Sequence, residues 1–427
     1  MIFNAGKEIL MKLKKILAAA GMTICAAICA TALSGCNVKF GTNPTTDPKL
    51  VVAKPTRLCF TDELNITFND FNKQYLFYLN SSGVEENSSN SEKCEQLRDT
   101  IIHNIIYDKV MMLKAKEFGC DVLTEEEEKE VKEEFDNEIK SQIEMFGDKA
   151  DYSDLPQGTT PTDAVKLERG EKEFNKLLEN CSLTREDIYG WIKNYRISQK
   201  MVDYFKTNKV QRKEAEDIYK DYVDDIKEIY EKSVSDYEKG DYSTFWAPEG
   251  SRRIKHVLLG FDDETTAAIK KYREEKNDEA ANALRTQKAA ELAEKQAEVE
   301  KAIDNGDKWE DILIKYSADA TGSSMYPDGY LVIPNGTSYV KEFQEAAFVP
   351  EKVGDITTCV SDYGLHIMVY AKSGEVSEEN QNDIIEYLHF NLAQNSFSEQ
   401  MNKWVDEYAF EIDYKAIRVE EEENSSN

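Results

Sequence analysis

The sequence has little of the chemistry on which metal sites and disulfide-rich folds depend. It contains four histidines and eight cysteines in 427 residues, and three of the cysteines belong to the N-terminal segment. The other five are an odd, scattered set without a close pair at metal-ligand spacing: Cys59, Cys94, Cys120, Cys181 and Cys359. Neither a metal, nor a cofactor, nor a disulfide framework is therefore expected, although a single bridge remains open.

The chain is also short of positive charge. It has 53 Lys and Arg residues against 82 Asp and Glu residues, a formal net charge of −29. Such a surface repels nucleic acid and anionic lipid headgroups, so we expect no nucleic-acid partner. The same charge helps to keep a membrane-tethered protein soluble.

The N-terminal segment has the parts of a signal peptide. A lysine-rich stretch from Met11 is followed by an apolar run over residues 16–32 and then by Leu33-Ser34-Gly35-Cys36. This site resembles a bacterial lipobox, which implies a signal peptide over residues 1–35 and lipidation of Cys36. Acyl chains would then hold the protein on the extracytoplasmic side of the cell membrane. An uncleaved transmembrane anchor is the alternative, because the apolar run is just short of a typical spanning helix.

Composition and periodicity organise the rest of the chain. Segment 36–56 is rich in Gly, Pro and Thr and predicts a flexible tether. Apolar residues recur at three- and four-residue steps over residues 97–113 and 384–405, which predicts helices with a buried stripe. His103 and His389 lie on these stripes, and we interpret them as buried structural residues.

The other two histidines stand in apolar, strand-like runs. His256 lies within residues 253–259 and His366 within residues 363–369. Between them come a segment that ends in Tyr316-Ser317-Ala318-Asp319 and another at residues 343–348. This order resembles a parvulin, a small prolyl cis/trans isomerase domain in which two histidines stand back to back beneath a proline pocket.

The helical segment before this region has a resemblance of its own. The stripe at residues 97–116, the turn at 117–127 and the run at 181–188 are similar to the helical chaperone module of the SurA and PrsA families. Together the two resemblances indicate a PrsA/SurA-type foldase lipoprotein with a parvulin-type isomerase domain. In such lipoproteins the helix after the parvulin packs back on the N-terminal module.

The resemblance implies an α+β fold. A mostly helical, discontinuous chaperone domain would hold an inserted parvulin domain, itself a four-stranded antiparallel sheet flanked by helices. The expected divisions are a signal peptide at 1–35, a lipidated flexible tether at 36–56, a helical chaperone domain at 57–247, a parvulin domain at 248–374, and a C-terminal helix with an acidic tail at 375–427.

The resemblance also implies the roles of individual residues. It assigns catalysis to His256 and His366, which would share a hydrogen bond if their strands are neighbours. The family's third polar group follows the Tyr/Phe-Ser motif and falls on Asp319. The hydroxyl partner is Ser361, with Tyr363 as a second possibility.

The proline pocket is assigned by the same resemblance to Leu331, Tyr339 and Phe343. The chain departs from the family at its Gly-Gly-x-Leu-Gly-Trp-Phe loop, which is residues 325–331 here. The double glycine is lost, and Leu331 stands in place of an aromatic residue. Residues 264–304 also exceed the single helix of the family and predict either a protruding helical hairpin or a solvated spacer.

These features predict a membrane-anchored, extracytoplasmic foldase that isomerises Xaa-Pro bonds in secreted proteins and chaperones their folding. Its partners would be unfolded or newly secreted polypeptides, with a homodimer left open. The barrier to rotation is about 18–20 kcal/mol, and lowering it requires neither a nucleophile nor a cofactor. The altered loop favours an alternative, a non-catalytic holdase with a degenerate parvulin domain. A solute-binding lipoprotein is disfavoured, because the chain is predicted to be helical outside residues 251–370.

Overall fold

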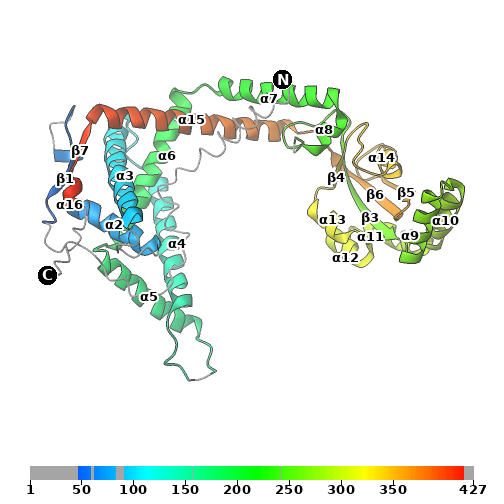
Figure 1. Ribbon diagram of the computed structural model, residues 1–427, viewed down its shortest axis with the longest axis horizontal. Coiled ribbons are helices and arrows are strands. Elements are labelled where there is room, and N and C mark those ends of the chain that lie inside the picture. The colour runs from blue at the N-terminus through cyan, green and yellow to red at the C-terminus, as the bar shows by residue number, and fades with distance from the viewer. Residues whose placement is uncertain (1–46, 59–61, 83–90, 157, 241, 418–427) are drawn as a thin grey trace, which may run out of the picture. The chain divides into compact units, whose positions relative to one another are not determined.

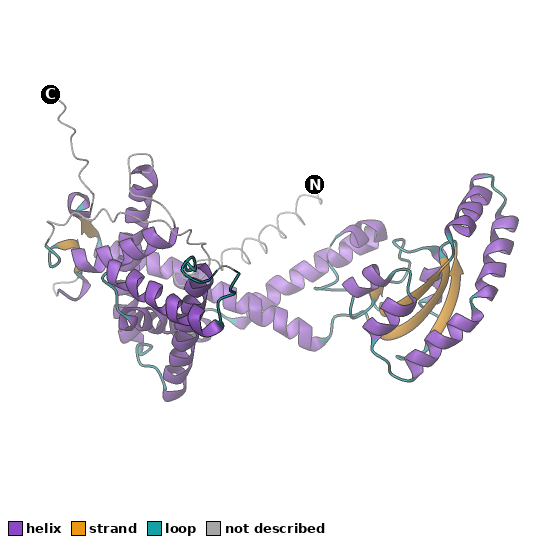
Figure 2. Cartoon of the chain, turned by 90° about the horizontal axis from the view of Figure 1, so that it is seen from below, coloured by secondary structure: helices purple, strands orange, loops and turns teal. Residues whose placement is uncertain are grey.

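The computed structural model describes residues 47–58, 62–82, 91–156, 158–240 and 242–417 (Figure 1). The predicted signal peptide and Cys36 lie outside these residues. Helices make up most of the described chain and the strands form two antiparallel sheets, which confirms the expected α+β class (Figure 2). Within the described ranges, no helix is both long enough and apolar enough to cross a membrane.

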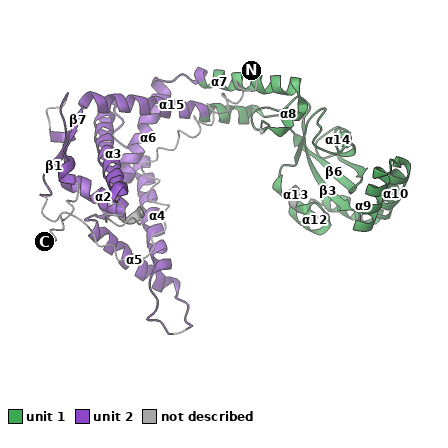
Figure 3. Ribbon diagram, in the orientation of Figure 1, with its two compact units in different colours: residues 1–9, 215–387 green, residues 10–214, 388–427 purple. Residues whose placement is uncertain are grey.

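Contacts divide the chain into two compact units (Figure 3). The described residues of 215–387 form one of them, which we call the sheet unit. Those of 10–214 and 388–427 form the other, the helical unit, which is therefore discontinuous in sequence.

A four-stranded antiparallel sheet forms the centre of the sheet unit, with its strands in the order β4-β3-β6-β5. These strands are β3 (Arg252–Gly260), β4 (Tyr330–Val332), β5 (Ile356–Ser361) and β6 (Gly364–Ser373). Side chains alternate between the two faces along each strand. Ile254 is therefore buried on one face against α14, whereas Val257 is buried on the other face against α11 and α12.

Six helices follow β3 or lie between the later strands. They are α9 (Asp263–Glu274), α10 (Asp278–Glu291), α11 (Ala293–Asp304), α12 (Trp309–Tyr316), α13 (Ala320–Met325) and α14 (Lys341–Ala346). Side chains of Asp262 and Asn277 cap α9 and α10 by accepting from backbone N–H groups. Ala281 of α10 and Val299 of α11 are fully buried, so this insertion packs in the sheet unit and is no solvated spacer.

The sheet unit begins earlier in the chain than residue 248, the boundary that the sequence predicted. Most of α7 (Arg212–Lys232) and all of α8 (Val234–Lys239) belong to it. The Tyr230 hydroxyl donates to the carbonyl of Pro334 (2.9 Å), and the Glu238 carboxylate accepts from the N–H groups of Thr337 (2.8 Å) and Ser338 (3.1 Å). These contacts between residues far apart in sequence hold both helices to the loop before α14.

The helical unit is built from long amphipathic helices. Its elements are β1 (Val51–Pro55), the 3-10 helix η2 (Asp62–Leu64), β2 (Ile66–Thr67), α2 (Phe68–Ser82), α3 (Ser91–Phe118), α4 (Glu125–Lys149), α5 (Asp163–Asn180), α6 (Arg185–Asn208), most of α15 (Glu378–Tyr408), β7 (Phe410–Ile412) and α16 (Tyr414–Ile417). Capping boxes start two of the helices, with Thr124 and Glu127 at α4 and with Thr184 and Asp187 at α6.

The C-terminal part of α15 completes the core of the helical unit. Phe397 packs on Phe205 and Trp404 packs on Phe118, with ring centroids 5.4 Å and 5.7 Å apart. Met401, between these two residues of α15, is fully buried. Residues distant in sequence thus share one core, because the apolar stripe of α15 requires a partner surface.

Strand β1 corrects the predicted tether. Residues 51–55 pair with β2 on one side and with β7 on the other, and Val52 and Ala53 are buried. The segment 36–56 is therefore not a tether throughout, since its final residues are the central strand of a three-stranded sheet. Residues 36–46 lie outside the described part of the chain.

The two histidines of the helical unit differ from each other. His389 is buried as predicted, and its Nε2 lies 3.0 Å from the carbonyl oxygen of Val210. The prediction for His103 is wrong, because its side chain is 52% exposed and its Nδ1 lies 3.4 Å from Asp99. A stripe at helical spacing is wider than the buried face, so a residue at its margin can face solvent.

The packing of α15 gives a prediction about stability. Replacing Met401 with Ala leaves a cavity in the helical unit and should lower its free energy of unfolding by about 2–5 kcal/mol. Hydrogen exchange of the slowest α3 amides measures this loss. Lys403→Ala, at an exposed position two residues on, is the matched control and should change it by no more than about 0.5 kcal/mol. Equal protection in both variants would contradict the assignment of α15 to this core.

Candidate functional site

His256 and His366 lie on the two central strands of the sheet. Strands β3 and β6 pair in antiparallel register, with His256 opposite Met368 and Leu258 opposite His366. Residues opposite each other in such a pair share a face of the sheet, as do residues two positions apart on a strand. The two histidines are therefore diagonal neighbours on the same face.

The two imidazole rings are buried and stacked. Their centroids are 5.5 Å apart with an interplanar angle of 28°, and the residues are only 5% and 6% exposed. The sequence predicted a hydrogen bond between His256 and His366. The described structure shows a stacked contact between the two rings instead. The Nε2 atoms of the two rings point to different partners.

Ser317 brings Asp319 to His256. The Ser317 hydroxyl accepts from the N–H groups of Leu258 (3.1 Å) and Asp319 (3.2 Å), and Ala318 N–H donates to the Leu258 carbonyl (2.8 Å). These bonds attach the segment between α12 and α13 to β3. The Asp319 carboxylate consequently lies 3.2 Å from Nε2 of His256. The serine of the sequence motif thus positions the acid that follows it.

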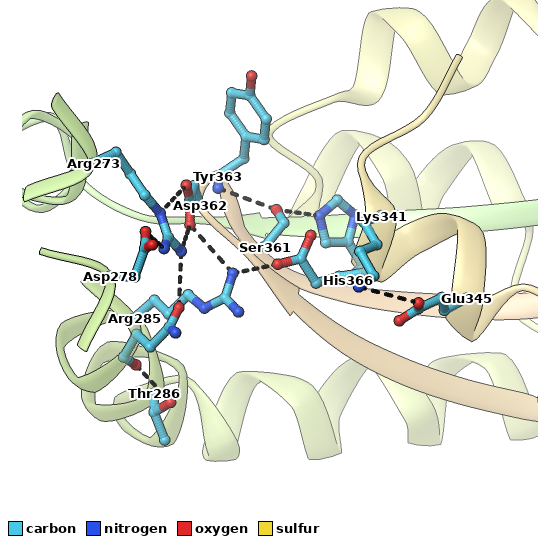
Figure 4. A network of polar contacts seen from close by, with 12 residues as sticks. Arg273, Asp278, Arg285, Thr286, Lys341, Glu345, Ser361, Asp362, Tyr363 and His366 are labelled. Carbon is cyan, nitrogen blue, oxygen red and sulfur yellow. Dashed lines mark hydrogen bonds and ion pairs between the residues drawn. The ribbon is translucent and has the colours of Figure 1, made fainter. Parts of the chain in front are cut away.

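Ser361 is the polar partner of the second histidine. Its hydroxyl is fully buried, accepts from the N–H of Tyr363 (3.1 Å) and lies 2.8 Å from Nε2 of His366 (Figure 4). Tyr363, the second possibility raised by the sequence, has a side chain directed away from His366, and the residue is 58% exposed. The structure therefore brings Ser361, and not the Tyr363 hydroxyl, to this imidazole.

Aromatic rings lie against the histidine pair. Phe343 of α14 contacts both imidazoles edge-on, with centroids 5.2 Å from His256 and 5.6 Å from His366. Tyr339 lies 5.2 Å from Phe343. Of the three residues predicted for the proline pocket, Phe343 thus contacts both histidines and Tyr339 packs on Phe343, and their part in binding stays a prediction.

Leu331, the third residue predicted for the pocket, is on the opposite face of the sheet. It pairs with Arg253, whereas Tyr330 pairs with Ile254 and so shares the face of His256. The Leu331 side chain points toward Gly374 instead. The assignment of Leu331 to the pocket was wrong by one residue, and a shift of one residue moves a strand side chain to the other face.

Tyr330 is the residue that sequence reasoning missed. Its ring centroid is 5.1 Å from that of His256, and its hydroxyl donates to Asp319 (2.8 Å). Tyr326 packs on it with centroids 4.8 Å apart. Tyr330 and Val332 lie two positions apart on β4 and so share one face of the sheet. This alternation is the signal in the sequence that could have placed Tyr330, and not Leu331, on the face of His256.

Burial makes the histidine pair electrically neutral. Desolvation lowers the pKa of His256, although the nearby Asp319 carboxylate opposes this shift. Desolvation, together with the neighbouring His256, lowers the pKa of His366 to about 4, against the opposing effects of Asp319 and Glu342. Both rings are thus uncharged at neutral pH, and an ionised Asp319 can only accept, so the Nε2 of His256 carries its proton.

The remaining candidate ligands do not gather into a metal site. Across the described ranges, no group of three or more His, Cys, Asp or Glu side chains could hold a metal ion. Three of the described cysteines are free thiols: Cys94, Cys120 and Cys359. The side chains of the site itself offer hydrogen bonds, aromatic contact and a dry, neutral surface.

The helical unit contains a separate, open cavity of about 380 Å³. Its lining mixes charged residues with apolar ones: Glu63, Asp70, Lys73, Gln74, Ile105, Asp108, Lys109, Met112, Leu113, Lys116, Asp187, Trp191 and Asn194. Lys73 and Asp187 form an ion pair at its wall (3.0 Å). Burial raises the pKa of Asp108 to about 7, so this carboxyl group is partly protonated at neutral pH.

Several solved structures are similar to this chain. The foldase protein PrsA of Streptococcus pneumoniae is 13% identical, with 85% of this chain and 97% of that chain covered and a TM-score of 0.27. For PrsA of Lactococcus lactis the identity is 14%, the coverage 86% and 96%, and the TM-score 0.30. A SurA-like chaperone of Campylobacter jejuni is 14% identical, with 63% of this chain and 90% of that chain covered and a TM-score of 0.17. No protein-family model and no curated protein matches the chain.

The lowered pKa of His366 predicts a pH dependence of stability. Unfolded histidine binds a proton near pH 6.5, whereas folded His366 does so only near pH 4. Between these values the unfolded chain binds more protons, so the free energy of unfolding falls as the pH is lowered, by up to about 1.4 kcal/mol per pH unit from this group. Urea unfolding of the wild type and of His366→Asn at pH 7 to 4.5 should show the smaller slope in the variant. Equal slopes would mean that His366 titrates normally.

Proposed function

We propose that this chain is an extracytoplasmic foldase whose sheet unit is a parvulin domain that catalyses cis/trans isomerisation of Xaa-Pro bonds in secreted proteins. The observation that carries the proposal is the buried, stacked pair of His256 and His366. Each imidazole has its own polar partner, Asp319 or Ser361, and both contact the ring of Phe343.

The neutrality of this pair suits the chemistry of amide rotation. A planar amide is strongly dipolar because resonance places negative charge on its oxygen, and the twisted amide at the top of the barrier has lost that resonance. A dry surface without net charge therefore stabilises the twisted form relative to the planar one. Catalysis follows from such differential stabilisation, since only interactions stronger in the transition state raise the rate.

The aromatic residues would hold the proline ring. Phe343, Tyr339 and Tyr330 have ring centroids within 6.5 Å of one another, and Phe343 and Tyr330 contact His256. A pyrrolidine ring is apolar and compact, so it gains by contact with these ring faces. The amide before the proline would then lie close to the two imidazoles.

Asp319 and Ser361 would fix the protonation of the imidazoles. Asp319 keeps the proton of His256 on Nε2, and its carboxylate, 38% exposed, also places negative charge at the rim of the site. The Ser361 hydroxyl, which already accepts from the chain, can donate to Nε2 of His366. The tautomers and ring orientations are thereby defined before a substrate binds.

The proposal assigns client binding and membrane attachment to the rest of the chain. The cavity in the helical unit, with Trp191 and mixed charges in its lining, would accept segments of unfolded or newly secreted polypeptides. Acyl chains on Cys36 would hold the protein at the outer side of the cell membrane.

A non-catalytic holdase is the second candidate function, and the contacts of Tyr330 favour it. The Tyr330 hydroxyl donates to the same Asp319 oxygen that His256 Nε2 approaches. Tyr326, 46% exposed, packs on Tyr330 from the loop where the family has its double glycine. In this alternative the aromatic cluster binds proline-containing segments without accelerating their rotation.

Exchange NMR on an Ala-Xaa-Pro-Phe peptide distinguishes the two functions. The chain from residue 37 should accelerate cis/trans exchange, because its neutral imidazole pair stabilises the twisted amide. The double variant His256→Ala, Asp319→Ala should lose about tenfold or more of that acceleration, the usual cost of removing preorganised polar groups.

His103→Ala is the matched control, because it removes an exposed histidine of the helical unit. It should keep the full acceleration. A well-folded wild-type chain that binds the peptide without accelerating its exchange would leave the holdase and contradict the enzyme.

A further inference from the structure

The helical insertion α9–α10 is joined to the candidate site by an ion-pair network (Figure 4). Arg273 of α9 grips the carboxylate of Asp362 through two nitrogens, Nε at 3.0 Å and Nη2 at 2.9 Å. Arg285 of α10 reaches the same carboxylate at 3.3 Å and also bonds to the Glu342 carboxylate. Two helices of the insertion thus meet on one acidic residue of the β5–β6 turn.

Asp362 lies in the sequence between Ser361 and Tyr363, the residue whose N–H holds the Ser361 hydroxyl. Ser361 precedes it and binds His366, and Tyr363 follows it and donates its N–H to the same hydroxyl. Any shift of the Asp362 backbone therefore moves the polar partner of His366. Both arginines that hold Asp362 belong to the insertion.

Glu342 connects the network to the other side of the site. It directly precedes Phe343, whose ring lies edge-on to both imidazoles. Arg285, through one Nη1 atom, therefore bridges the turn that follows Ser361 and the helix that bears Phe343. No other described ion pair joins these two elements.

The burial of the network gives it more weight than an ordinary surface ion pair. The Arg285 side chain is 18% exposed and that of Arg273 is 28% exposed. Partly buried pairs are screened less by solvent, and a guanidinium that grips a carboxylate through two nitrogens also fixes its orientation. Such a network constrains geometry more than it adds to global stability.

We propose that the insertion is a positioning element of the isomerase site, in which Arg285 and Arg273 set the separation of Ser361 and Phe343 around His366. This inference rests on the proposed isomerase function. Neither arginine is a catalytic residue, since both act through Asp362 and Glu342. A displacement of about 1 Å within a preorganised site can cost a hundredfold in rate, so a loss of this bridge should be visible in catalysis.

The test compares Arg285→Met with Lys288→Met in the chain from residue 37. Lys288 lies one turn further along α10 and forms an ion pair with Glu291 of the same helix (2.9 Å), so it is a matched control outside the network. Arg285→Met should lower kcat/KM for the Ala-Xaa-Pro-Phe peptide by about ten- to a hundredfold. Lys288→Met should stay within twofold of the wild type, and both variants should unfold at the wild-type urea midpoint.

Two further variants separate positioning from general damage. Arg285→Lys keeps a positive charge, but a lysine can reach only one of the two carboxylates. It should therefore retain more activity than Arg285→Met. It also tests the proposal if Arg285→Met does not fold. Adding Glu342→Gln to Arg285→Met should cause no further loss, because both changes break the same Arg285–Glu342 link. Wild-type activity in Arg285→Met, or equal losses in it and Lys288→Met, would overturn the proposal.

The imidazole signals of 15N-histidine-labelled protein keep this test independent of the isomerase proposal. Arg285→Met should move the His366 signals, whereas Lys288→Met should leave them in place. If the wild-type chain has no isomerase activity, the proposed function fails, but the positioning of His366 is still decided by this comparison. Unmoved His366 signals in a folded Arg285→Met chain would overturn it.

Discussion

The site depends on one contact, the stacking of two buried imidazoles on a single face of a β-sheet. The contact requires that β3 and β6 be antiparallel neighbours in a register that sets His256 diagonal to His366. Burial then removes the charge of both rings, because an imidazolium ion would lose its hydration there without an adequate partner. Neutral rings can stack closely and can present a dry surface to an amide, whereas two charged rings would repel each other. Each remaining part of the site either holds a ring in place or covers it.

The surroundings of the pair come from segments that lie far apart in sequence. Ser317 attaches the acid-bearing segment to β3, and Ser361, the last residue of β5, lies beside His366. Phe343 approaches both rings from α14. The charged insertion α9–α10, which looks dispensable from composition, contacts the turn and α14 through its arginines. The site on this small sheet is thus completed by helices and loops that lie outside its strands.

Sequence reasoning found the residues whose position follows from strand patterning or a local motif. His256 and His366 stand in apolar runs, and Asp319 follows a Tyr-Ser pair, and it was the resemblance of this order to a parvulin that implied their proximity. Leu331 was misplaced because a one-residue error along a strand exchanges the two faces of the sheet, and Tyr330 was missed for the same reason. The strand at residues 51–55 was read as a tether, since its partner β7 comes from the opposite end of the chain. The network of Arg273 and Arg285 was equally out of reach, because ion pairs between distant residues leave no periodic signal in a sequence.

The location of the site can be tested directly, because two of the four histidines lie in it and two lie in the helical unit. The chain from residue 37, labelled with 15N-histidine and assigned by single substitutions, would be titrated with an Ala-Xaa-Pro-Phe peptide at neutral pH. The stacked pair predicts that the signals of His256 and His366 shift with peptide concentration, while those of His103 and His389 stay in place. Peptide binding that leaves the stacked pair unmoved, or that shifts only the two histidines of the helical unit, would contradict the assignment of the site.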